Sequence, residues 1–187
     1  MQKVETLNIN QRYPMIELLR KRRSIRKYTN EKIDVESRNI LIEAALRAPS
    51  ARGINPWEFI LVDDQELILQ LSQAKQFGSA FLINAPFAIV VCGDSSKADF
   101  WIEDCSITAT IIQLTASSLG LGSCWIQIRN RQHDDNKTAE AYVQELLGLP
   151  EHIKVSSILA IGYPDETKPT VSAENLQYEK IKDNRWV

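Results

Sequence analysis

Arg20–Lys27, with the sequence RKRRSIRK, is the most strongly charged stretch of this 187-residue chain. Six of its eight residues are cationic, although the formal net charge of the whole chain is −2. Arginine suits a phosphate because its planar guanidinium donates two parallel hydrogen bonds and stays charged, and Ser24 adds a hydroxyl donor. The stretch could form a phosphate site, a nucleic-acid patch, or a solvated helix end whose cations complement the helix dipole. Charge alone favours the helix end.

Helices are predicted on both sides of this stretch. Pro14 suits the first turn of a helix, and apolar residues at helical spacing follow it. Asp34 is a candidate N-cap, and one apolar face follows until Pro49 ends the second helix. The remaining pattern predicts helices at 63–74, 77–83, 99–119 and 138–147, and strands at 57–62, 87–92, 121–126 and 155–161.

The order of these elements indicates the fold class. Helices and strands alternate irregularly, which favours an α+β sandwich over a regular doubly wound sheet. The length, with 44% hydrophobic and 25% charged residues, is typical of one globular domain over 1–187. The segment 166–187 is polar and has no clear period, yet it contains Trp186. We therefore expect an extended C-terminal arm that packs on another surface, such as a second chain.

Charge and cysteine usage exclude several classes of protein. The isoelectric point of about 5.8 argues against a general nucleic-acid binder. No uncharged apolar stretch is long enough to span a bilayer, and Met1–Asn10 has no apolar run of the kind found in signal peptides. Three scattered cysteines and two histidines favour a reducing, cytoplasmic compartment and argue against a zinc or iron–sulfur site.

The loop at 48–56 has two interpretations. It is either a simple connection from helix to strand, which the residues alone favour, or a place where Ser50 and the amide of Asn55 meet a flat heteroaromatic ligand. Gly120–Trp125 lacks the spacing of a phosphate loop and of a nucleophile elbow. Carboxylate pairs such as Glu103-Asp104 are interpreted as caps or solvated faces. No catalytic side chain stands out, which is expected if a cofactor carries the chemistry.

Four motifs, taken in order, resemble the FMN-dependent nitroreductase family. The similarity runs from about residue 14 to the end of the chain, and four motifs at the family's spacings are more specific than any one of them. The motifs are Arg22–Arg26, Ala48–Ala51 with Asn55–Trp57, Leu119–Ile126 at the end of the long helix, and Ile161–Pro164 before the arm.

The resemblance implies a fold, an assembly and an activity. The fold would be a three-layer α/β/α sandwich with a mostly antiparallel central sheet, and the chain would be a homodimer that exchanges its C-terminal arms. The activity would be hydride transfer from NAD(P)H through FMN to nitroaromatics, quinones or similar small acceptors. A reductive dehalogenase or a flavin-modifying enzyme on the same fold is the alternative. A non-enzymatic anion or nucleic-acid binding module is the alternative from another class.

The resemblance also implies the cofactor contacts, with no catalytic side chain and no metal ligand. In the arm, Arg185 could compete with Lys168 for the phosphate. The contacts carried over are Arg22, Arg23, Ser24 and Lys168 for the phosphate, Arg26 for the flavin pyrimidine, Pro49, Ser50 and Ala51 for the flavin of the partner chain, and Trp125, Ile126 and Gln127 along the ring.

Two departures from the family pattern affect these expectations. Gly53 stands where the family commonly has Asn, and Asn55 stands where it commonly has Gln before Pro-Trp. We expect Asn55 to be the candidate replacement for the usual side-chain contact to the flavin pyrimidine. Gln127 and Ile128 stand where a Gly is common, so substrate choice is not carried over.

Overall fold

In residues 14–186, which the computed structural model describes, four strands form one antiparallel sheet. Their order across the sheet is β1-β2-β4-β3, and every neighbouring pair is antiparallel. The bounds are β1 Trp57–Val62, β2 Phe87–Asp94, β3 Gly122–Gln127 and β4 Ile153–Gly162. All four strands predicted from the sequence are present.

The two central strands carry the core. Every residue of β2 is buried, which confirms the interpretation of its continuous apolar run as a strand covered on both faces. Successive residues of β2 and β4 point to opposite faces of the sheet. Ile89 and Leu159 pack in one cluster with Ile112, whereas Val90 and Ile158 pack in a second cluster.

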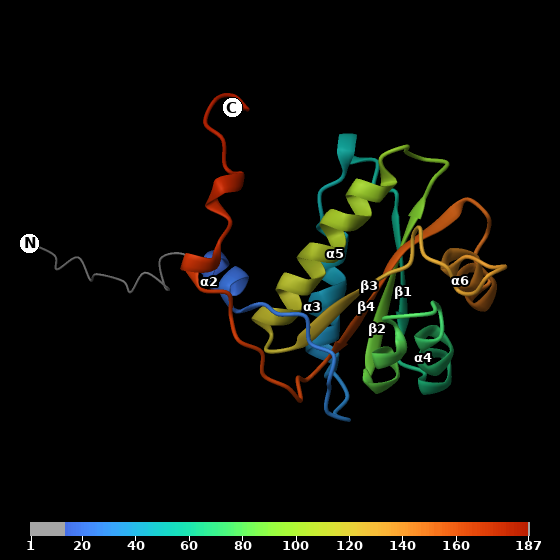
Figure 1. The fold of residues 1–187 in the computed structure, drawn as a ribbon. Coiled ribbons are helices and arrows are strands. Elements are labelled where there is room, and N and C mark those ends of the chain that lie inside the picture. Colours follow the sequence, from blue (N-terminus) through green and yellow to red (C-terminus); the bar gives the residue numbers. More distant parts are fainter. Residues whose placement is uncertain (1–13, 187) are drawn as a thin grey trace, which may run out of the picture.

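Helices cover both faces of this sheet (Figure 1). Helices α3 (Val35–Leu46) and α5 (Trp101–Ser118) lie on one side, and α4 (Gln65–Ser72) and α6 (Ala139–Leu147) lie on the other. The long helix α5 is buried along much of its length, as its apolar residues on more than one face predict. The three-layer α/β/α sandwich with an antiparallel sheet is thus confirmed.

The helix ends follow local sequence signals, with one exception. Asp34 caps α3 by accepting from the backbone N–H of Ser37, as predicted, and Asp64 caps α4 in the same way. The helix predicted at 77–83 is wrong, because only a short 3₁₀ turn forms, η2, at Ala80–Asn84. Gly78 has a φ of +81°, a left-handed conformation that interrupts a right-handed helix.

Helix α2 (Pro14–Lys21) contacts α5 at the side of the sandwich, and the C-terminal arm extends past α2 away from the sheet (Figure 1). Helix α2 has no buried residue, and the described part of the arm contains only two short 3₁₀ turns, η3 (Ala173–Asn175) and η4 (Tyr178–Lys180). Large apolar side chains of the arm are exposed, such as Ile181 at 70% and Trp186 at 86%. Met1–Asn10, where no signal peptide is expected from the sequence, lies outside the described residues. Within residues 14–186, no helix is long and apolar enough to cross a membrane.

Candidate cofactor site

The basic stretch is fixed to the edge of the sheet by one buried side chain. Ile25 is buried against Gly122, where an added Cβ would lie 2.8 Å from the Cβ of Ile25. The backbone N–H of Ile25 donates to the carbonyl of Ser123 at 3.0 Å, and Ser24 forms a parallel bridge with Ser123. The residues on either side of Ile25 are consequently held at the start of β3.

The beginning of the arm completes this region from the other end of the chain. Lys168 donates from Nζ to the carbonyl of Ser24 at 2.7 Å, and Arg23 donates to the carbonyl of Pro169. Glu166 accepts from the backbone N–H of Arg26 at 2.5 Å. We call residues 22–27 together with 166–169 the basic cradle.

Glu166 holds the basic cradle together electrostatically. Its carboxylate accepts from the backbone N–H of Lys27 at 3.3 Å as well as from Arg26, and lies 3.2 Å from Nζ of Lys168. The hydrogen bond from the Arg26 N–H, followed by the interactions with Lys168, lowers the pKa of Glu166 below its ordinary value. One anion is therefore built into a group of cations and organises their backbone.

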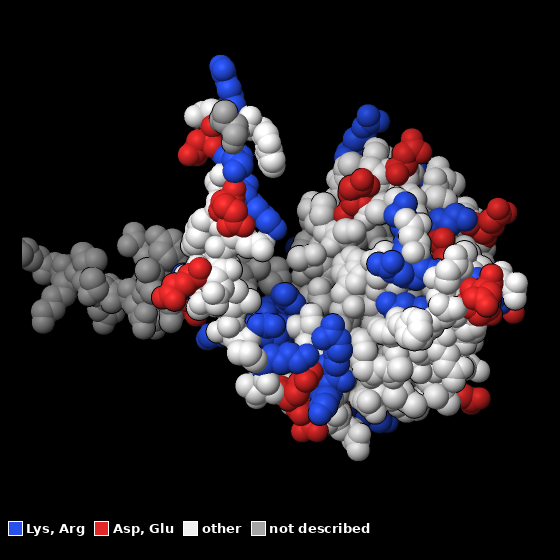
Figure 2. Space-filling model, viewed as in Figure 1, with Lys and Arg blue, Asp and Glu red and all other residues white. Residues whose placement is uncertain are grey.

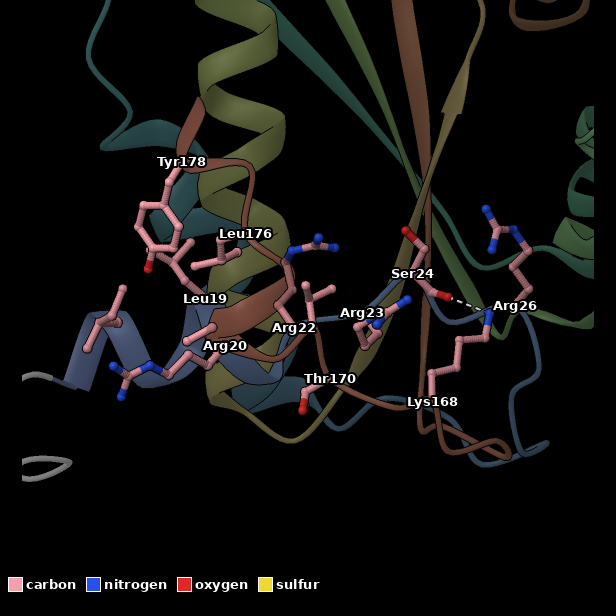
Figure 3. Close-up of a pocket in the computed structure, with 13 residues that line it drawn as sticks. Leu19, Arg20, Arg22, Arg23, Ser24, Arg26, Lys168, Thr170, Leu176 and Tyr178 are labelled. Atoms are coloured by element: carbon pink, nitrogen blue, oxygen red, sulfur yellow. Dashed lines mark hydrogen bonds between the residues drawn. The ribbon is translucent and has the colours of Figure 1, made fainter. Parts of the chain in front are cut away.

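A cavity of about 910 Å³ lies between the basic cradle, α2 and the arm. Figure 3 shows Arg23 and Lys168 close to Ser24, with Arg22 on the same segment. In Figure 2, Lys and Arg side chains gather where the arm joins the body of the molecule. The predicted site residues that line this cavity are Arg22, Arg23, Ser24, Arg26 and Lys168, whereas Arg185 does not line it.

The cations of the basic stretch fall into two groups. Arg20 lies 2.6 Å from Glu17 and Lys21 lies 3.9 Å from the same carboxylate, so these two cations are neutralised within α2. Arg22, Arg23 and Arg26 have no carboxylate partner within 4.0 Å in residues 14–186. Positive charge without a counter-ion in a cavity favours an anionic ligand.

Arg26 extends the positive charge beyond the cavity. Figure 3 shows its guanidinium directed away from Arg23 and Lys168, and its Cζ lies 5.6 Å from the centre of the Phe81 ring. A cation over an aromatic face is stabilised by the ring quadrupole. The basic cradle thus places charge in two directions, toward the cavity and toward η2.

The outer edge of β3 offers backbone donors beside Arg26. β3 pairs with β4 on one side only, and the Ser123 carbonyl points outward to Ile25. In an antiparallel pair, alternate residues point their backbone groups to the same side, so Trp125 and Gln127 share this outward direction. The side chain of Gln127 accepts from Nε1 of Trp125 at 2.9 Å. The side chain of Ile126, which lies between these two residues, points to the opposite face of the sheet and is fully buried in the core.

The loop before β1 forms its own compact turn. The hydroxyl of Ser50 donates to Oδ1 of Asn55 at 2.7 Å and accepts from the backbone N–H of Asn55 at 2.8 Å. Asn55 has a φ of 51°, a left-handed conformation that asparagine tolerates better than most residues. Since Oδ1 of Asn55 is occupied by Ser50, its amide nitrogen is the group left to meet a ligand.

The same chain does not bring this loop to the basic cradle. The backbone N–H of Ala51 donates to Oδ1 of Asp104 at 3.0 Å, near the start of α5. The basic cradle lies where β3 begins, just after the end of α5. A helix rises 1.5 Å per residue, so Asp104 and Leu119 are separated by about 22 Å. The predicted residues Pro49, Ser50, Ala51 and Asn55 accordingly form a second, separate group.

Two important residues were not identified from the sequence. The interpretation of Glu103-Asp104 as a cap or solvated pair is wrong for Asp104, whose side chain is buried, with only 3% of the residue exposed. Its Oδ2 has no hydrogen-bond partner in the described part of the chain. No local pattern signals this burial, which results from packing of the loop on α5. Glu166 was also missed, because its role depends on Arg26, 140 residues away.

The comparisons agree with the resemblance stated from the sequence. A family model described as the nitroreductase family matches residues 19–76 and 65–163. A solved FMN-dependent nitroreductase from Clostridium difficile R20291 is 49% identical, with a TM-score of 0.90 over 91% of this chain and 99% of that one.

Two further proteins give the same result at lower identity. A protein of Archaeoglobus fulgidus, provisionally named as an NADH dehydrogenase/NAD(P)H nitroreductase, is 36% identical over 91% of this chain and 98% of its own length. The solved NADPH:FMN oxidoreductase of Vibrio harveyi, complexed with NAD⁺, is 28% identical, with a TM-score of 0.77 over 92% of this chain and 78% of that one.

Proposed function

Because the chain belongs to the nitroreductase family, we propose that it is an FMN-dependent oxidoreductase. It takes a hydride from NAD(P)H and delivers it to nitroaromatic, quinone or similar small electrophilic acceptors, one substrate after the other. The observation that carries the proposal is the basic cradle, in which Arg22, Arg23 and Arg26 have no carboxylate partner within residues 14–186. The geometry fits a ligand with one anionic end and one flat polar ring.

The residues of the basic cradle match the two ends of FMN. Arg22, Arg23 and Lys168 would hold the phosphate, with the hydroxyl of Ser24 as a further donor. The flavin supplies the hydride chemistry when it is bound. Arg26 places a positive charge beside β3, where negative charge on the reduced ring would be stabilised.

The edge of β3 orients the ring. The outward N–H groups of Trp125 and Gln127 are fixed donors on a strand whose other face is buried, so they cost little entropy when they bind a ring nitrogen or carbonyl. The mutual hydrogen bond of the Trp125 and Gln127 side chains holds both along this edge. No side chain of the protein is assigned as a general base, since protons can come from water.

A homodimer would bring the second group of residues to this site. Pro49, Ser50, Ala51 and Asn55 lie about 22 Å along α5 from the basic cradle of their own chain, so they would serve the flavin of the partner. The exposed apolar residues of α2 and of the arm provide surface for a second copy, and the arms would be exchanged between the two. The three free cysteines fit a cytoplasmic location.

The spectrum of the purified protein tests the proposal. We expect a visible flavin absorption band, lost when NADPH or NADH is added without oxygen and restored by a nitroaromatic or a quinone. Protein that is colourless and cannot be reconstituted with FMN would contradict the proposal. A halogenated phenol is tested in parallel, because turnover of that compound alone would assign reductive dehalogenation instead.

A further inference from the structure

Two side chains of β3 reach the surface of the molecule. Within this strand, Trp125 and Gln127 are half-buried, and the other four residues are buried. Successive residues of a strand alternate between the two faces of a sheet, so Trp125 and Gln127 project from the same face. This face carries α5, because Trp125 packs against the core cluster that contains Ile112. The two side chains therefore form the surface of β3 beside the edge where the flavin ring is proposed to lie.

The carboxamide of Gln127 joins these two side chains into one unit. Its Oε1 accepts from Nε1 of Trp125 at 2.9 Å, and its Nε2 donates to the carbonyl of Arg129 at 2.9 Å. An indole N–H can only donate and a carbonyl can only accept, so the carboxamide satisfies both partners in one orientation. With both ends occupied, Gln127 is held by its own chain and holds the indole in turn.

The groups on either side of this unit are fixed to the sheet. The backbone N–H groups of Ile128 and Arg129 both donate to the carbonyl of Ser156 in β4, each at 3.2 Å. Trp125 lies directly opposite Leu159, which is fully buried in the same core cluster. The indole is thus held by packing on the core and by a hydrogen bond to a side chain that is itself anchored.

A fixed indole limits the space next to the proposed flavin. The outward N–H groups of Trp125 and Gln127 face the ring, while the side chains of the same residues stand roughly perpendicular to the sheet. They consequently border the space beside the ring on the face that carries α5. A side chain whose rotamer is locked by hydrogen bonds and packing gives this space a constant width. A glycine, which is common in this part of the family pattern, could make neither hydrogen bond.

We propose that Gln127 is a positioning residue, which locks the indole of Trp125 and thereby limits the size of the acceptor that reaches the flavin. The acceptors favoured are small flat nitroaromatics and quinones over those with extended fused rings. This inference rests on the proposed function, because it assumes that the flavin lies along the edge of β3. The lock itself is a property of the chain and can be measured without the flavin.

The first experiment measures the lock in protein without FMN. Each of the four tryptophans gives an indole N–H signal in a nitrogen–proton correlation spectrum, and Trp125→Phe identifies one signal by its loss. We expect Gln127→Met, which keeps the length but lacks the carboxamide, to shift this signal and to speed exchange of its proton with water. Gln144→Met is the matched control, because Gln144 is also half-buried and donates to the carbonyl of Ile153 on the opposite side of the sheet.

The second experiment measures selectivity in protein reconstituted with FMN. The value of kcat/KM is measured for nitrobenzene and for its larger fused-ring analogue 1-nitronaphthalene. The ratio of the two values cancels differences in flavin content and in the amount of folded protein, so damage to the fold alone does not change it. We expect Gln127→Met to raise this ratio about 10-fold in favour of 1-nitronaphthalene, and Gln127→Gly to raise it further. Gln144→Met leaves the ratio unchanged.

A double variant tests whether Gln127 acts through Trp125. Trp125→Phe removes the indole that Gln127 holds, so adding Gln127→Met to it should change the ratio less than about 2-fold. A double variant in which the two single effects multiply would overturn the positioning role, because Gln127 would then act without the indole.

Two further results would overturn the proposal. One is an unchanged Trp125 signal in Gln127→Met, which would show that the lock does not exist in solution. The other is an unchanged acceptor ratio in both Gln127→Met and Gln127→Gly, which would show that the indole does not border the acceptor. A wild-type protein that cannot be reconstituted with FMN is a distinguishable result. It contradicts the proposed function, and with it the role of Gln127 in acceptor choice, before any variant is made.

Discussion

The basic cradle and the loop around Ser50 are two polar regions that differ in where their hydrogen-bond partners lie along the chain. In the basic cradle, the carbonyl of Ser24 and the backbone N–H of Arg26 both have partners in residues 166–169, about 140 positions away. In the loop, Ser50 and Asn55 bond to each other across five residues. The distant hydrogen bonds of the loop reach its own sandwich, from Ala51 to Asp104 and from Asp94 to Pro56.

This difference shows that one chain forms the basic cradle without the loop. The basic cradle has its donors, its cavity and its internal counter-ion, Glu166, in a single chain. The loop is fixed in shape but faces no cavity with the basic cradle, because the length of α5 separates them. The proposed homodimer would bring this exposed loop to the flavin of a partner chain.

Removal of Arg22 is expected to have the largest effect, because the basic cradle acts within one chain. Arg22→Ala removes a charge-assisted contact to the proposed flavin phosphate, which is worth about 1.5–3 kcal/mol, or roughly 10- to 150-fold in FMN affinity. The dissociation constant is measured by quenching of flavin fluorescence on titration with apoprotein.

Arg20→Ala is the matched control for this change. Arg20 is adjacent in sequence and also lines the cavity, but its guanidinium is paired with Glu17. Removal of an exposed pair of this kind changes stability by about 1 kcal/mol or less, and we expect FMN affinity to change little. Equal flavin content in Arg22→Ala and wild type would show that the phosphate does not bind at the basic cradle.

Substitution of Asp104 tests the loop around Ser50. Asp104→Ala leaves the N–H of Ala51 without its acceptor beneath the loop, which should lower the free energy of unfolding by about 1–3 kcal/mol. Asp104→Asn keeps the acceptor oxygen and removes a buried charge whose Oδ2 has no partner in the described chain, so we expect unchanged or higher stability. Chemical denaturation measures both.

FMN affinity in these two variants decides what the loop does. If the loop serves the flavin of a partner, Asp104→Ala weakens FMN binding only under conditions where the protein is a dimer by light scattering. A fall in affinity that is the same for monomer and dimer would show that the loop acts within its own chain. No change in either would restrict Asp104 to a role in folding.

Local signals in the sequence account for much of the fold. The caps Asp34 and Asp64 each lie directly before the helix that they begin, and the apolar run of β2 needs burial on both faces. Such features depend on neighbours within a few residues, so periodicity detects them. The resemblance to a known family was needed for the layers and for the division of the basic stretch, in which Arg22 and Arg26 are proposed to bind the cofactor and Arg20 is not.

The remaining features depend on contacts between distant residues. Asp104 has the same acidic neighbour and the same helical position as many solvated residues, and only the packing of Ala51 above it makes it buried. The contact between the segment after α4 and the loop after β3 is equally invisible in the sequence, because it is made by the backbone N–H of Gln76 and the carbonyl of Gln132. Charge and spacing in the sequence do not show which surface cations have a carboxylate partner in the folded chain.

The smallest expected effect comes from the internal counter-ion of the basic cradle. The pKa of Glu166 is lowered from its ordinary value of 4.5, first by the hydrogen bond from the Arg26 N–H and then by Lys168. A carboxyl whose pKa is lower in the folded than in the unfolded state stabilises the fold above pH 4.5, and this contribution is lost as the pH falls through the folded-state pKa.

Glu166→Gln keeps the acceptor oxygen but loses the charge. We therefore expect its Tm to lie slightly below that of wild type at neutral pH, with the difference closing in acid. The measurement is a series of thermal unfolding curves from pH 3 to pH 7, roughly the range in which carboxyl groups titrate. A difference in Tm that stays constant over this range would show that Glu166 organises the basic cradle through shape and hydrogen bonding, with no contribution from its charge.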